Sequence, residues 1–323
     1  MPRDLQPAPT PVAPVLPAEA GAGAAVPAEA GAPGAGAVVA VPAEVAVAGA
    51  GAIARLRAAS RLAGGAALAP VYRAYAARLR ADVVAHPVPH HVALIMDGNR
   101  RWARELGLHG IRAGHSHGAD KAVELLDWCS AIGIREVTLW ALSLENLERP
   151  AEEVAAITEI ARETLDALAQ RDRVRRMQMS LQVIGRRDLL PERLREAAER
   201  GEAETRGRTG LRVTLALGYS GRDELVEAAR AAVRSLVAEG TAPEVLADAL
   251  TAERLAAQLY TSGSSDPDLI IRTSGEVRLS GFLPWQSAYS EFYFCDAYWP
   301  AFREIDLLRA VRTYQQRARR FGR

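Results

Sequence analysis

The stretch His91-Val-Ala-Leu-Ile-Met96, which runs directly into Asp97-Gly98-Asn99-Arg100-Arg101-Trp102, decides the fold class of this 323-residue chain. Its apolar residues are expected to form a buried strand that stops at a carboxylate, and a helix is expected to open after Gly98. Five later segments have the same apolar character and are also expected to be strands: EVTLWALS (136–143), SLQVIG (180–185), LRVTLALGYS (211–220), DLIIRTSG (268–275) and EFYFCD (291–296).

Segments with helical periodicity lie between most of these strands and after the last one. They cover residues 117–134, 150–170, 191–204, 221–240 and 303–320. Apolar strands that alternate with amphipathic helices predict an α/β protein, a single domain with a mostly parallel, six-stranded sheet flanked by helices. Ligands of such sheets bind at the carboxyl ends of the strands, so the functional residues should lie there.

Residues 1–66 form a low-complexity tail of Ala, Gly, Pro and Val in which the phrase PAEAGA or PAEV recurs. The tail lacks large apolar side chains and is expected to be disordered. The tail lacks the Leu-rich segment of a signal peptide, which argues against that interpretation. Pro42 and Glu44 interrupt its most apolar window, which argues against a membrane span. Residues 67–323 are expected to form the globular domain, beginning with an amphipathic helix over residues 67–87.

The composition argues against several classes of protein. With 40 basic and 39 acidic residues the net charge is +1, so no strong overall field attracts nucleic acid or an anionic membrane. The two cysteines, Cys129 and Cys295, are far apart and form no CxxC pair. This argues against a disulfide framework or a structural zinc site and favours a reducing, cytoplasmic location.

The end of the first strand carries groups that suit a diphosphate. The backbone N–H groups after Gly98, together with Arg100 and Arg101, could hold its oxygens, and Asp97 could hold Mg²⁺ against them. The alternative is an ordinary helix N-cap formed by Asp97 with the neighbouring Asn99. The sequence leaves both interpretations open.

Two further strand ends are rich in polar side chains. The segment SLENLER (143–149) combines a hydroxyl, carboxylates, an amide and a guanidinium, and the alternative is a polar loop with a helix cap. The segment RTSGEVRLS (272–280) offers two arginines and several hydroxyls, which suit phosphate oxygens. The alternative there is a solvated loop in which Glu276 neutralises Arg272 or Arg278.

Glu291 begins the last apolar strand and therefore needs a partner. A metal shared with Asp97 would satisfy it, and a salt bridge to a nearby arginine is the alternative. Oxygen ligands and phosphates indicate Mg²⁺ rather than zinc. The histidines of His90-His91 and His115-Ser116-His117 accompany no zinc motif, so phosphate contact or ordinary surface positions are expected for them.

The order and wording of these motifs resemble one family. The segments HVALIMDGNRRWA, GHSHGADK, ALSLENLERP, GYSGRDEL, DPDLIIRTSGEVRLSGFLPWQSAYSEFYF and RRFGR are similar to motifs of the cis-prenyltransferases, the Z-isoprenyl diphosphate synthases that include undecaprenyl diphosphate synthases. The resemblance runs from about His91 to Arg323 and implies the cis-prenyltransferase fold. It implies that an allylic diphosphate loses pyrophosphate, isopentenyl diphosphate adds to it and a proton leaves, while Mg²⁺ stabilises the leaving group.

The resemblance also implies roles for the residues at the strand ends. Asp97 resembles the metal-binding catalytic aspartate of the family, Asn146 its proton acceptor and Glu291 its second metal ligand. Because an amide is a poor base, we expect Asn146 to orient a proton path to the pyrophosphate. The substrate-binding positions of the family are matched by Gly98, Asn99, Arg100 and Arg101 around the allylic diphosphate, by Trp102 beside it, and by His115, Ser143, Leu144, Glu145, Leu147, Arg149, Arg272, Arg278, Leu279 and Ser280.

The chain ends in Arg320-Phe321-Gly322, which matches the Arg-x-Gly ending of the family. That ending reaches the substrate site of a partner subunit, so the resemblance implies a homodimer. The alternative is an ordinary basic helix end. Any contact with a membrane is expected to be peripheral and through the product alone.

The sequence departs from the family pattern at two places. Many members have an arginine four residues before the histidine matched by His115, but Ile111 occupies that position and Arg112 stands one place later. It is open whether Arg112 replaces that arginine. Leu142 and Leu147 stand where long-chain enzymes usually have aromatic residues, and both are expected to line the substrate tunnel.

The tunnel of the family sets the length of the product. The wording LSLENL, SGFLPWQSAYSE and LYTSGSSDPDL is similar to short-chain synthases, so we expect geranyl diphosphate to be converted to (2Z,6E)-farnesyl diphosphate. A longer decaprenyl or undecaprenyl product is the alternative. Two other classes are a non-catalytic partner subunit, which would lack the aspartate at position 97, and an anion- or nucleic-acid-binding protein that uses the arginines of the last helix.

Overall fold

Six parallel strands form one sheet in the computed structural model, which describes residues 70, 72–108, 111–170 and 172–317. All five strand pairings are parallel, in the order β3-β4-β2-β1-β5-β6. The predicted strands are therefore all confirmed. Their bounds are β1 (His91–Ile95), β2 (Glu136–Ser143), β3 (Ser180–Ile184), β4 (Arg212–Tyr219), β5 (Leu269–Arg272) and β6 (Glu291–Phe294).

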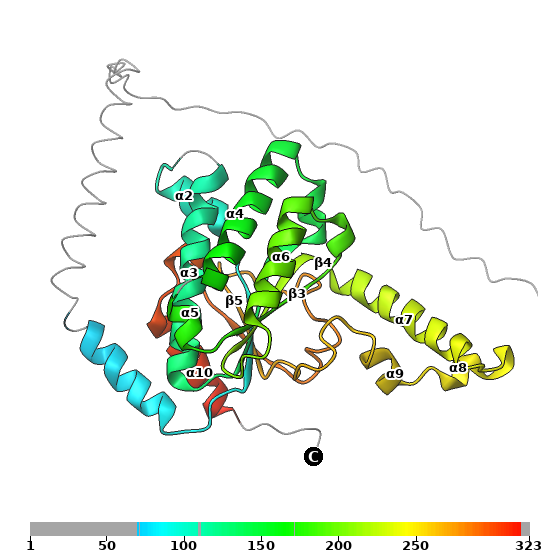
Figure 1. Cartoon of the computed structure of the whole chain (residues 1–323). Helices are drawn as coiled ribbons and strands as arrows, with labels where there is room; N and C mark the ends of the chain where they lie inside the picture. Colours follow the sequence, from blue (N-terminus) through cyan, green and yellow to red (C-terminus); the bar gives the residue numbers. More distant parts are fainter. Residues whose placement is uncertain (1–69, 71, 109–110, 171, 318–323) are drawn as a thin grey trace, which may run out of the picture. The chain divides into compact units, whose positions relative to one another are not determined.

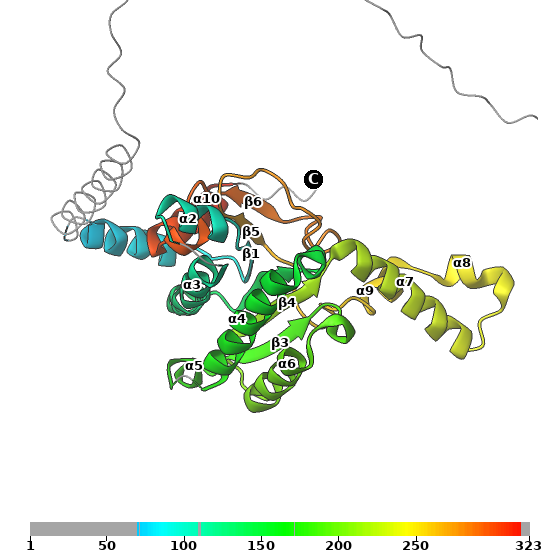
Figure 2. The same cartoon turned by 90° about the horizontal axis from the view of Figure 1, so that it is seen from above.

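Helices cover one face of this sheet and build the main core (Figures 1 and 2). Alternate strand residues such as Val92 and Leu94 point to that face. They pack there against α3 (Ile111–Ile132), α4 (Ala151–Gln170), α6 (Glu192–Thr205) and α10 (Glu304–Gln316). The predicted helices on this face are confirmed. Two shorter helices, α2 (Asn99–Glu105) and α5 (Asp172–Arg176), flank them.

The opposite face of the sheet carries a smaller apolar cluster. Ala93 and Ile95 belong to it, together with Phe282 and Leu283 from the segment between β5 and β6. The Trp140 ring stacks on Phe282 with centroids 5.1 Å apart and an angle of 7° between the planes. An irregular segment with large side chains therefore supplies part of the cover on this face.

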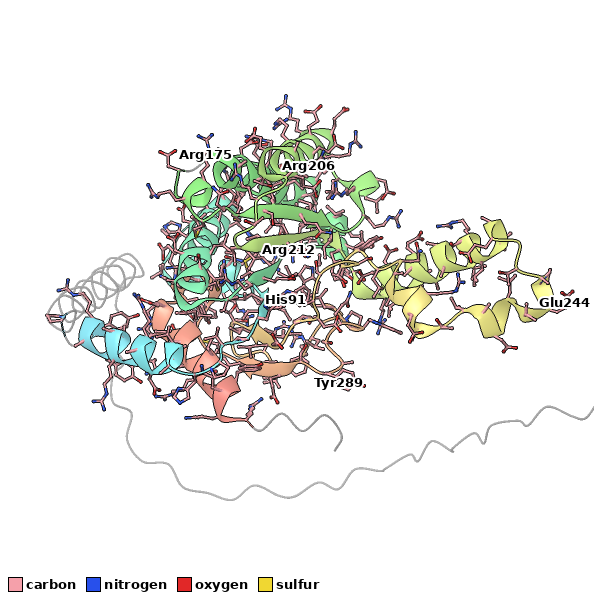
Figure 3. All side chains as sticks on the ribbon, turned by 60° about the horizontal axis from the view of Figure 1, so that its bottom comes forward. His91, Arg175, Arg206, Arg212, Glu244 and Tyr289 are labelled. Carbon is pink, nitrogen blue, oxygen red and sulfur yellow. The ribbon has the colours of Figure 1, made fainter. Side chains whose placement is uncertain are left out.

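Three helices between β4 and β5 extend away from the sheet: α7 (Gly221–Ala238), α8 (Leu246–Ala249) and α9 (Ala252–Ala256). In Figure 3, His91 and Arg212 lie near the middle of the view, and Glu244 lies far from them at the end of this arm. The buried residues of α7 include Ala228 and Ala232, whose small side chains contribute little to a core. The helix predicted over residues 221–240 is therefore confirmed as α7, but its residues do not belong to the main core.

The helix that leads into the domain covers residues 72–84 of the described chain and lies within the predicted range of 67–87. Its Leu79 and Val83 are buried in the main core. Gln315 of α10 donates from Nε2 to the Val83 carbonyl oxygen at 2.8 Å, which ties the end of this helix to α10. The predicted tail, residues 1–66, and the chain ending, residues 318–323, lie outside the described residues. None of the described helices is long and apolar enough to cross a membrane.

Side chains complete the hydrogen bonding along the outer edge of β3. The backbone N–H groups of Leu181 and Val183 donate to Thr205 Oγ1 at 2.9 Å and to Glu202 Oε1 at 2.7 Å. Arg187 donates to the Val183 carbonyl oxygen. The last turns of α6 and the 3₁₀ turn η2 (Arg187–Leu189) before it therefore take the place of a seventh strand.

A buried histidine at the start of β1 makes the stability of the fold depend on pH. His91 donates from Nδ1 to the Ser265 carbonyl oxygen at 2.6 Å, and its Nε2 accepts from the Thr138 hydroxyl at 2.8 Å. Burial lowers the pKa of His91 below its usual value, although the Ser265 carbonyl and the charges of Glu136 and Asp268 oppose that shift. The folded chain therefore holds His91 neutral.

We predict that the free energy of unfolding falls as the pH drops below about 6.5, because the unfolded chain then takes up a proton that folded His91 resists. The loss from this one group should not exceed about 1.4 kcal/mol per pH unit. Urea denaturation at pH 7.5, 6.5 and 5.5 measures it. The variant His91→Gln should show a smaller decrease over this range, and an equal decrease in both proteins would contradict the prediction.

Candidate active site

A polar pocket lies at the carboxyl ends of β1, β2 and β5, the edge at which the parallel sheet was predicted to bind ligands. Six of its lining residues are arginines, and Asp97 is the one carboxylate among the lining residues that the structure describes. Such a pocket attracts a polyanion. It is lined by Ile95, Met96, Asp97, Gly98, Asn99, Arg100, Arg101, Arg104, His115, Trp140, Ala141, Ser143, Asn146, Arg149, Arg272, Arg278 and Ser280.

Most of the site residues predicted from the sequence line this pocket. Those that do not are Trp102, Leu144, Glu145, Leu147, Leu279 and Glu291. Trp102 instead packs on the His117 ring, with centroids 4.9 Å apart. Arg112 pairs with Glu163 of α4 at 2.8 Å and is also absent from the lining.

The turn from β1 into α2 directs Asp97 into the pocket. Gly98 has a φ of 103°, in the left-handed region, and is itself the N-cap of α2 with no side-chain cap. The N-cap interpretation of Asp97 is therefore wrong. The backbone N–H of Asp97 donates to Thr273 Oγ1 at 2.9 Å, and that hydroxyl donates to the Asp97 carbonyl oxygen at 2.7 Å, which fixes the turn to the end of β5.

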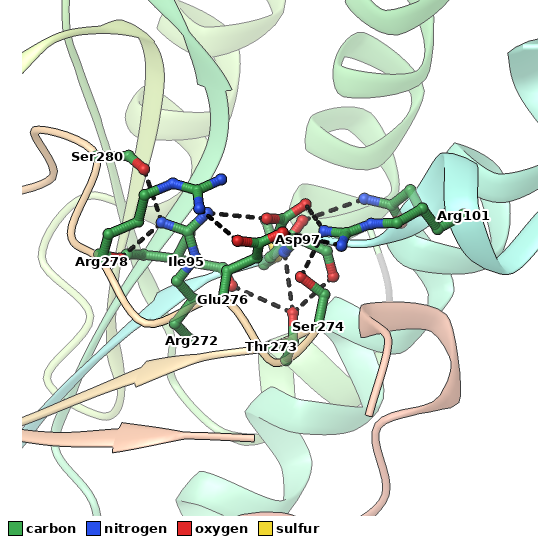
Figure 4. A network of polar contacts seen from close by, with 11 residues as sticks. Ile95, Asp97, Arg101, Arg272, Thr273, Ser274, Glu276, Arg278 and Ser280 are labelled. Atoms are coloured by element: carbon green, nitrogen blue, oxygen red, sulfur yellow. Dashed lines mark hydrogen bonds and ion pairs between the residues drawn. The ribbon is translucent and has the colours of Figure 1, made fainter. Parts of the chain in front are cut away.

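Two arginines surround the Asp97 carboxylate (Figure 4). Arg272 donates from Nη2 to Oδ2 at 2.9 Å, and the Nη2 atom of Arg101 lies 3.3 Å from Oδ1. Burial would raise the pKa of Asp97, but the hydrogen bond and charge of Arg272 and the charge of Arg101 outweigh burial and lower it. Asp97 is therefore a carboxylate at neutral pH, which a metal ligand must be.

Arg272 also shapes the loop that follows β5. This side chain is 4% exposed and donates from Nη1 to the Arg278 carbonyl oxygen at 2.6 Å and to Ser280 Oγ at 2.7 Å. Ser274 and Ser280 have φ values of 76° and 53°, which are rare for residues with a side chain. Strained backbone of this kind persists only where surrounding contacts impose it. Arg272 supplies such a contact at Ser280, and Arg101 donates to Ser274 Oγ at 2.7 Å.

Two glycines allow α3 to approach the start of α2. A Cβ atom on Gly114 would lie 2.3 Å from the Asn99 carbonyl oxygen, and one on Gly118 would lie 2.3 Å from Asn99 Oδ1. This close contact brings His115, between the two glycines, to the pocket. Burial, followed by the charges of Arg149 and Arg100, lowers the pKa of His115, so its imidazole is neutral at pH 7. Its Nε2 atom is buried without a hydrogen-bond partner.

Two glutamates that the sequence did not assign to the site hold pairs of pocket arginines together. Glu153 Oε1 accepts from Arg149 at 2.7 Å and from Arg100 at 3.2 Å. Glu276 pairs with Arg101 through Oε1 and with Arg278 through Oε2, so the predicted neutralisation by Glu276 is confirmed for Arg278. The acidic residues next to the arginine motifs were the available signal, but sequence spacing does not show that each glutamate bridges two elements.

An apolar cavity continues from the polar pocket between α3, α4 and the sheet. The two spaces share Met96, Asn99, His115 and Ala141. The remaining lining residues of the cavity are Gly118, Ala119, Ala122, Leu139, Ile157, Ile160, Ala161, Thr164, Leu168, Leu215, Leu217 and Trp299. Small residues on the inner sides of α3 and α4 leave this space open, and their helical spacing was the signal that could have located it.

Leu142 and Leu147 do not line this cavity, contrary to expectation. The β2–β4 register is irregular between Trp140 and Ser143, which disturbs the usual alternation of side chains. Ala141 lines the cavity, as does Leu139 two residues before it, while Leu142 is 1% exposed within the main core and Leu147 packs against that core.

Glu291 lies at the amino ends of the parallel strands, whereas Asp97 lies at their carboxyl ends. It is level with Leu269, which is level with Val92, so Asp97 lies roughly 15 Å farther along the strand direction. Glu291 pairs with Arg317 at the end of α10. The prediction of a metal shared by Asp97 and Glu291 is therefore wrong for two residues of the same chain. The alternative prediction, a salt bridge from Glu291 to a nearby arginine, describes its contact with Arg317.

Asp97 alone can still hold a magnesium ion in this pocket. The described residues contain no group of three or more His, Cys, Asp or Glu side chains that could hold a metal. Proteins commonly bind Mg²⁺ through one or two carboxylates together with the phosphate oxygens of a substrate. An ionised Asp97 in the lining of an arginine-rich pocket fits that mode of binding.

Comparison with known proteins agrees with the geometry. Residues 95–322 match a family model described as "Putative undecaprenyl diphosphate synthase". An isoprenyl transferase of Thermus thermophilus is 48% identical over 254 residues, which cover 79% of this chain and 96% of the relative. A (2Z,6E)-farnesyl diphosphate synthase of Thermobifida fusca is 48% identical over 253 residues, covering 78% of this chain and 97% of the relative.

A solved structure is also similar over the described domain. Lavandulyl diphosphate synthase from Lavandula x intermedia, crystallised with dimethylallyl diphosphate, aligns with a TM-score of 0.66 and 33% sequence identity. The alignment covers 73% of this chain and 99% of that chain. Fold, pocket and sequence relatives agree, and the chain belongs to the cis-prenyltransferase family.

Proposed function

We propose that this chain condenses isopentenyl diphosphate with geranyl diphosphate to form (2Z,6E)-farnesyl diphosphate. The observation that carries the proposal is the junction of an arginine-lined pocket with an apolar cavity through Met96, Asn99, His115 and Ala141. A diphosphate suits the first space and a prenyl chain the second. The name of the Thermobifida fusca relative supports the short product.

In this proposal Asp97 holds a Mg²⁺ ion, which would neutralise charge on the departing pyrophosphate. Arg272 and Arg101 flank Asp97 and bind the remaining diphosphate oxygens through their free N–H groups. The backbone N–H of Asn146 donates to Ser143 Oγ at 3.2 Å, which fixes the turn from which Asn146 reaches the pocket. Asn146 then orients the path by which the proton leaves toward the pyrophosphate.

Incubation of the purified protein with Mg²⁺, radiolabelled isopentenyl diphosphate and separate allylic starters tests the proposal. Chromatography of the dephosphorylated products against E and Z standards should give a fifteen-carbon Z,E product from geranyl diphosphate. A ladder of many isoprene units would replace the short product with a polyprenyl product. The absence of any product would favour a non-catalytic partner subunit.

Leu168 is expected to limit the length of the product. The residues of α4 that line the cavity run from Ile157 to Leu168, a distance of about 16 Å along the helix. Leu168 is fully buried at the far end, so Leu168→Ala should open space there and shift the products to longer chains. Chromatography of the products measures this shift.

The variant Leu308→Ala is a matched control for Leu168→Ala. Leu308 is also fully buried, but it lies on α10 and does not line the cavity. Both substitutions should cost about 2–5 kcal/mol of stability. If Leu308→Ala lengthens the product as much as Leu168→Ala does, the effect comes from general loosening and the prediction is wrong.

The proposal includes a homodimer in the cytoplasm. Val277, Tyr289 and Phe294 are apolar and 73%, 75% and 36% exposed near the edge strand β6, which suits contact with a second copy. Light scattering should give the mass of a dimer, and Phe294→Glu should lower it toward that of a monomer. A monomer in the unmodified protein would contradict this.

The proposed cytoplasmic location is supported by the two cysteines, Cys129 and Cys295. Both are free and buried, which is typical of proteins in a reducing compartment.

A further inference from the structure

Glu276 links two arginines that come from different parts of the pocket (Figure 4). Its Oε1 accepts from Arg101 Nη1 at 3.0 Å, and its Oε2 accepts from Arg278 Nη1. Arg101 belongs to α2, and Arg278 lies in the loop after β5. Both arginines line the pocket, whereas Glu276 does not, so the carboxylate holds them from outside the space that the ligand would enter.

The loop that carries Glu276 is held on both sides of this residue. Arg101 also donates from Nη2 to Ser274 Oγ at 2.7 Å, and Arg272 holds Ser280 Oγ at 2.7 Å, so the loop is fixed on both sides of Glu276. The hydrogen bond from Arg278, with the charge of that residue and the hydrogen bond from Arg101, lowers the pKa of Glu276. The bridge therefore carries a full negative charge at neutral pH.

The charge of Glu276 has two physical consequences. Two guanidinium groups that contact one carboxylate are close enough to repel each other, so the carboxylate offsets a repulsion that would drive Arg101 and Arg278 apart. The same charge also lowers the positive potential of the pocket and so weakens its attraction for any diphosphate. One effect preserves geometry, and the other limits affinity.

We propose that Glu276 is a positioning residue that sets the separation of Arg101 and Arg278 and keeps pyrophosphate from binding too tightly to leave. The inference rests on the proposed function, in which each turnover releases one pyrophosphate. It assigns to Glu276 a balance between holding the substrates and releasing the product. A purely structural residue would not change these two properties in opposite directions.

The variant Glu276→Gln tests the proposal because it keeps the size of the side chain and removes its charge. Isothermal titration with inorganic pyrophosphate should show binding about tenfold tighter than in the unmodified protein. At saturating substrates and Mg²⁺, kcat should fall at least about tenfold. Pyrophosphate binding that is unchanged or weaker, or a kcat that is unchanged, would overturn the proposal.

Two further variants separate charge from geometry. Glu276→Asp keeps the charge but shortens the side chain, so pyrophosphate affinity should stay within about twofold while kcat falls. Glu239→Gln removes a carboxylate that binds Arg254 on the arm, and it should change neither quantity. If Glu276→Asp binds pyrophosphate as tightly as Glu276→Gln does, the charge is not the cause and the proposal fails.

The outcomes also distinguish this inference from the proposed function. If the unmodified protein makes no product with any allylic starter, the proposed function fails, whatever the variants bind. If the unmodified protein makes the product and Glu276→Gln matches it in kcat and pyrophosphate affinity, only the inference about Glu276 fails. Thermal melting of each variant shows whether it has folded.

Discussion

Replacing Asp97 with asparagine is expected to lower kcat by about a thousandfold or more. The amide keeps the size of the side chain but removes the charge that Arg272 and Arg101 surround, and it is a poor ligand for Mg²⁺. Because this loss falls on the departure of pyrophosphate, saturating substrate should not restore the rate. Steady-state assays at saturating isopentenyl diphosphate, allylic diphosphate and Mg²⁺ measure it.

Stability must be measured alongside, because Arg272 is 4% exposed and would lose its charged partner. Loss of one partner from a buried pair costs about 3–5 kcal/mol, and the partial exposure of Asp97 should bring the cost below that range. Asp188→Asn is a matched control, since Arg186 pairs with Asp188 outside the pocket. Asp188→Asn should keep full activity. A folded Asp97→Asn protein with more than about a tenth of the normal kcat would contradict the assigned role.

The second large effect is expected from Gly98→Ala. Gly98 has a φ of 103°, and an added Cβ would lie 2.7 Å from Tyr298 Cδ1 and 3.0 Å from Ser274 Cβ. Backbone strain and this overlap together should cost about 2–4 kcal/mol of stability. Relief of the overlap moves the turn that carries Asp97, so kcat/KM should fall about a hundredfold.

Gly240→Ala separates backbone strain from misplacement of the site. Gly240 has a φ of 83°, at the end of α7, and a Cβ there would meet nothing within 4 Å. Its cost should be about 1–2 kcal/mol, with no loss of activity. Urea denaturation and steady-state kinetics on both variants make the comparison. Equal kcat/KM values for the two alanine variants would show that the turn at Gly98 does not position Asp97.

The sequence predicted the strands and most of the pocket for the same physical reason. Apolar runs mark strands that are buried on both faces, and in a parallel sheet the polar residues after β1, β2 and β5 must meet at one edge. Asp97, Ser143 and Arg272 therefore came together as expected. The turn at Gly98 was also readable, because a glycine between a strand and a helix indicates unusual backbone.

The errors arose where one-dimensional order leaves the direction or partner of a side chain undetermined. Glu291 is also at a strand end, but it is the amino end, so the rule that gathered the other residues excludes it. Leu142 was misplaced because an irregularity in register is invisible in an apolar run. Glu153 and Glu276 were missed as bridges, since each contact depends on two elements that meet only in the folded chain.

The closed outer edge of β3 bears on the solubility of the protein rather than on its chemistry. An open strand edge offers free N–H and C=O groups to any other extended chain and is a common starting point for aggregation. Thr205 and Glu202 already occupy the N–H groups of Leu181 and Val183, so a foreign strand would have to displace α6 before it could pair there. The contacts of α6 therefore block the addition of a foreign strand at β3. In this way α6 helps to keep the protein in solution as its concentration rises.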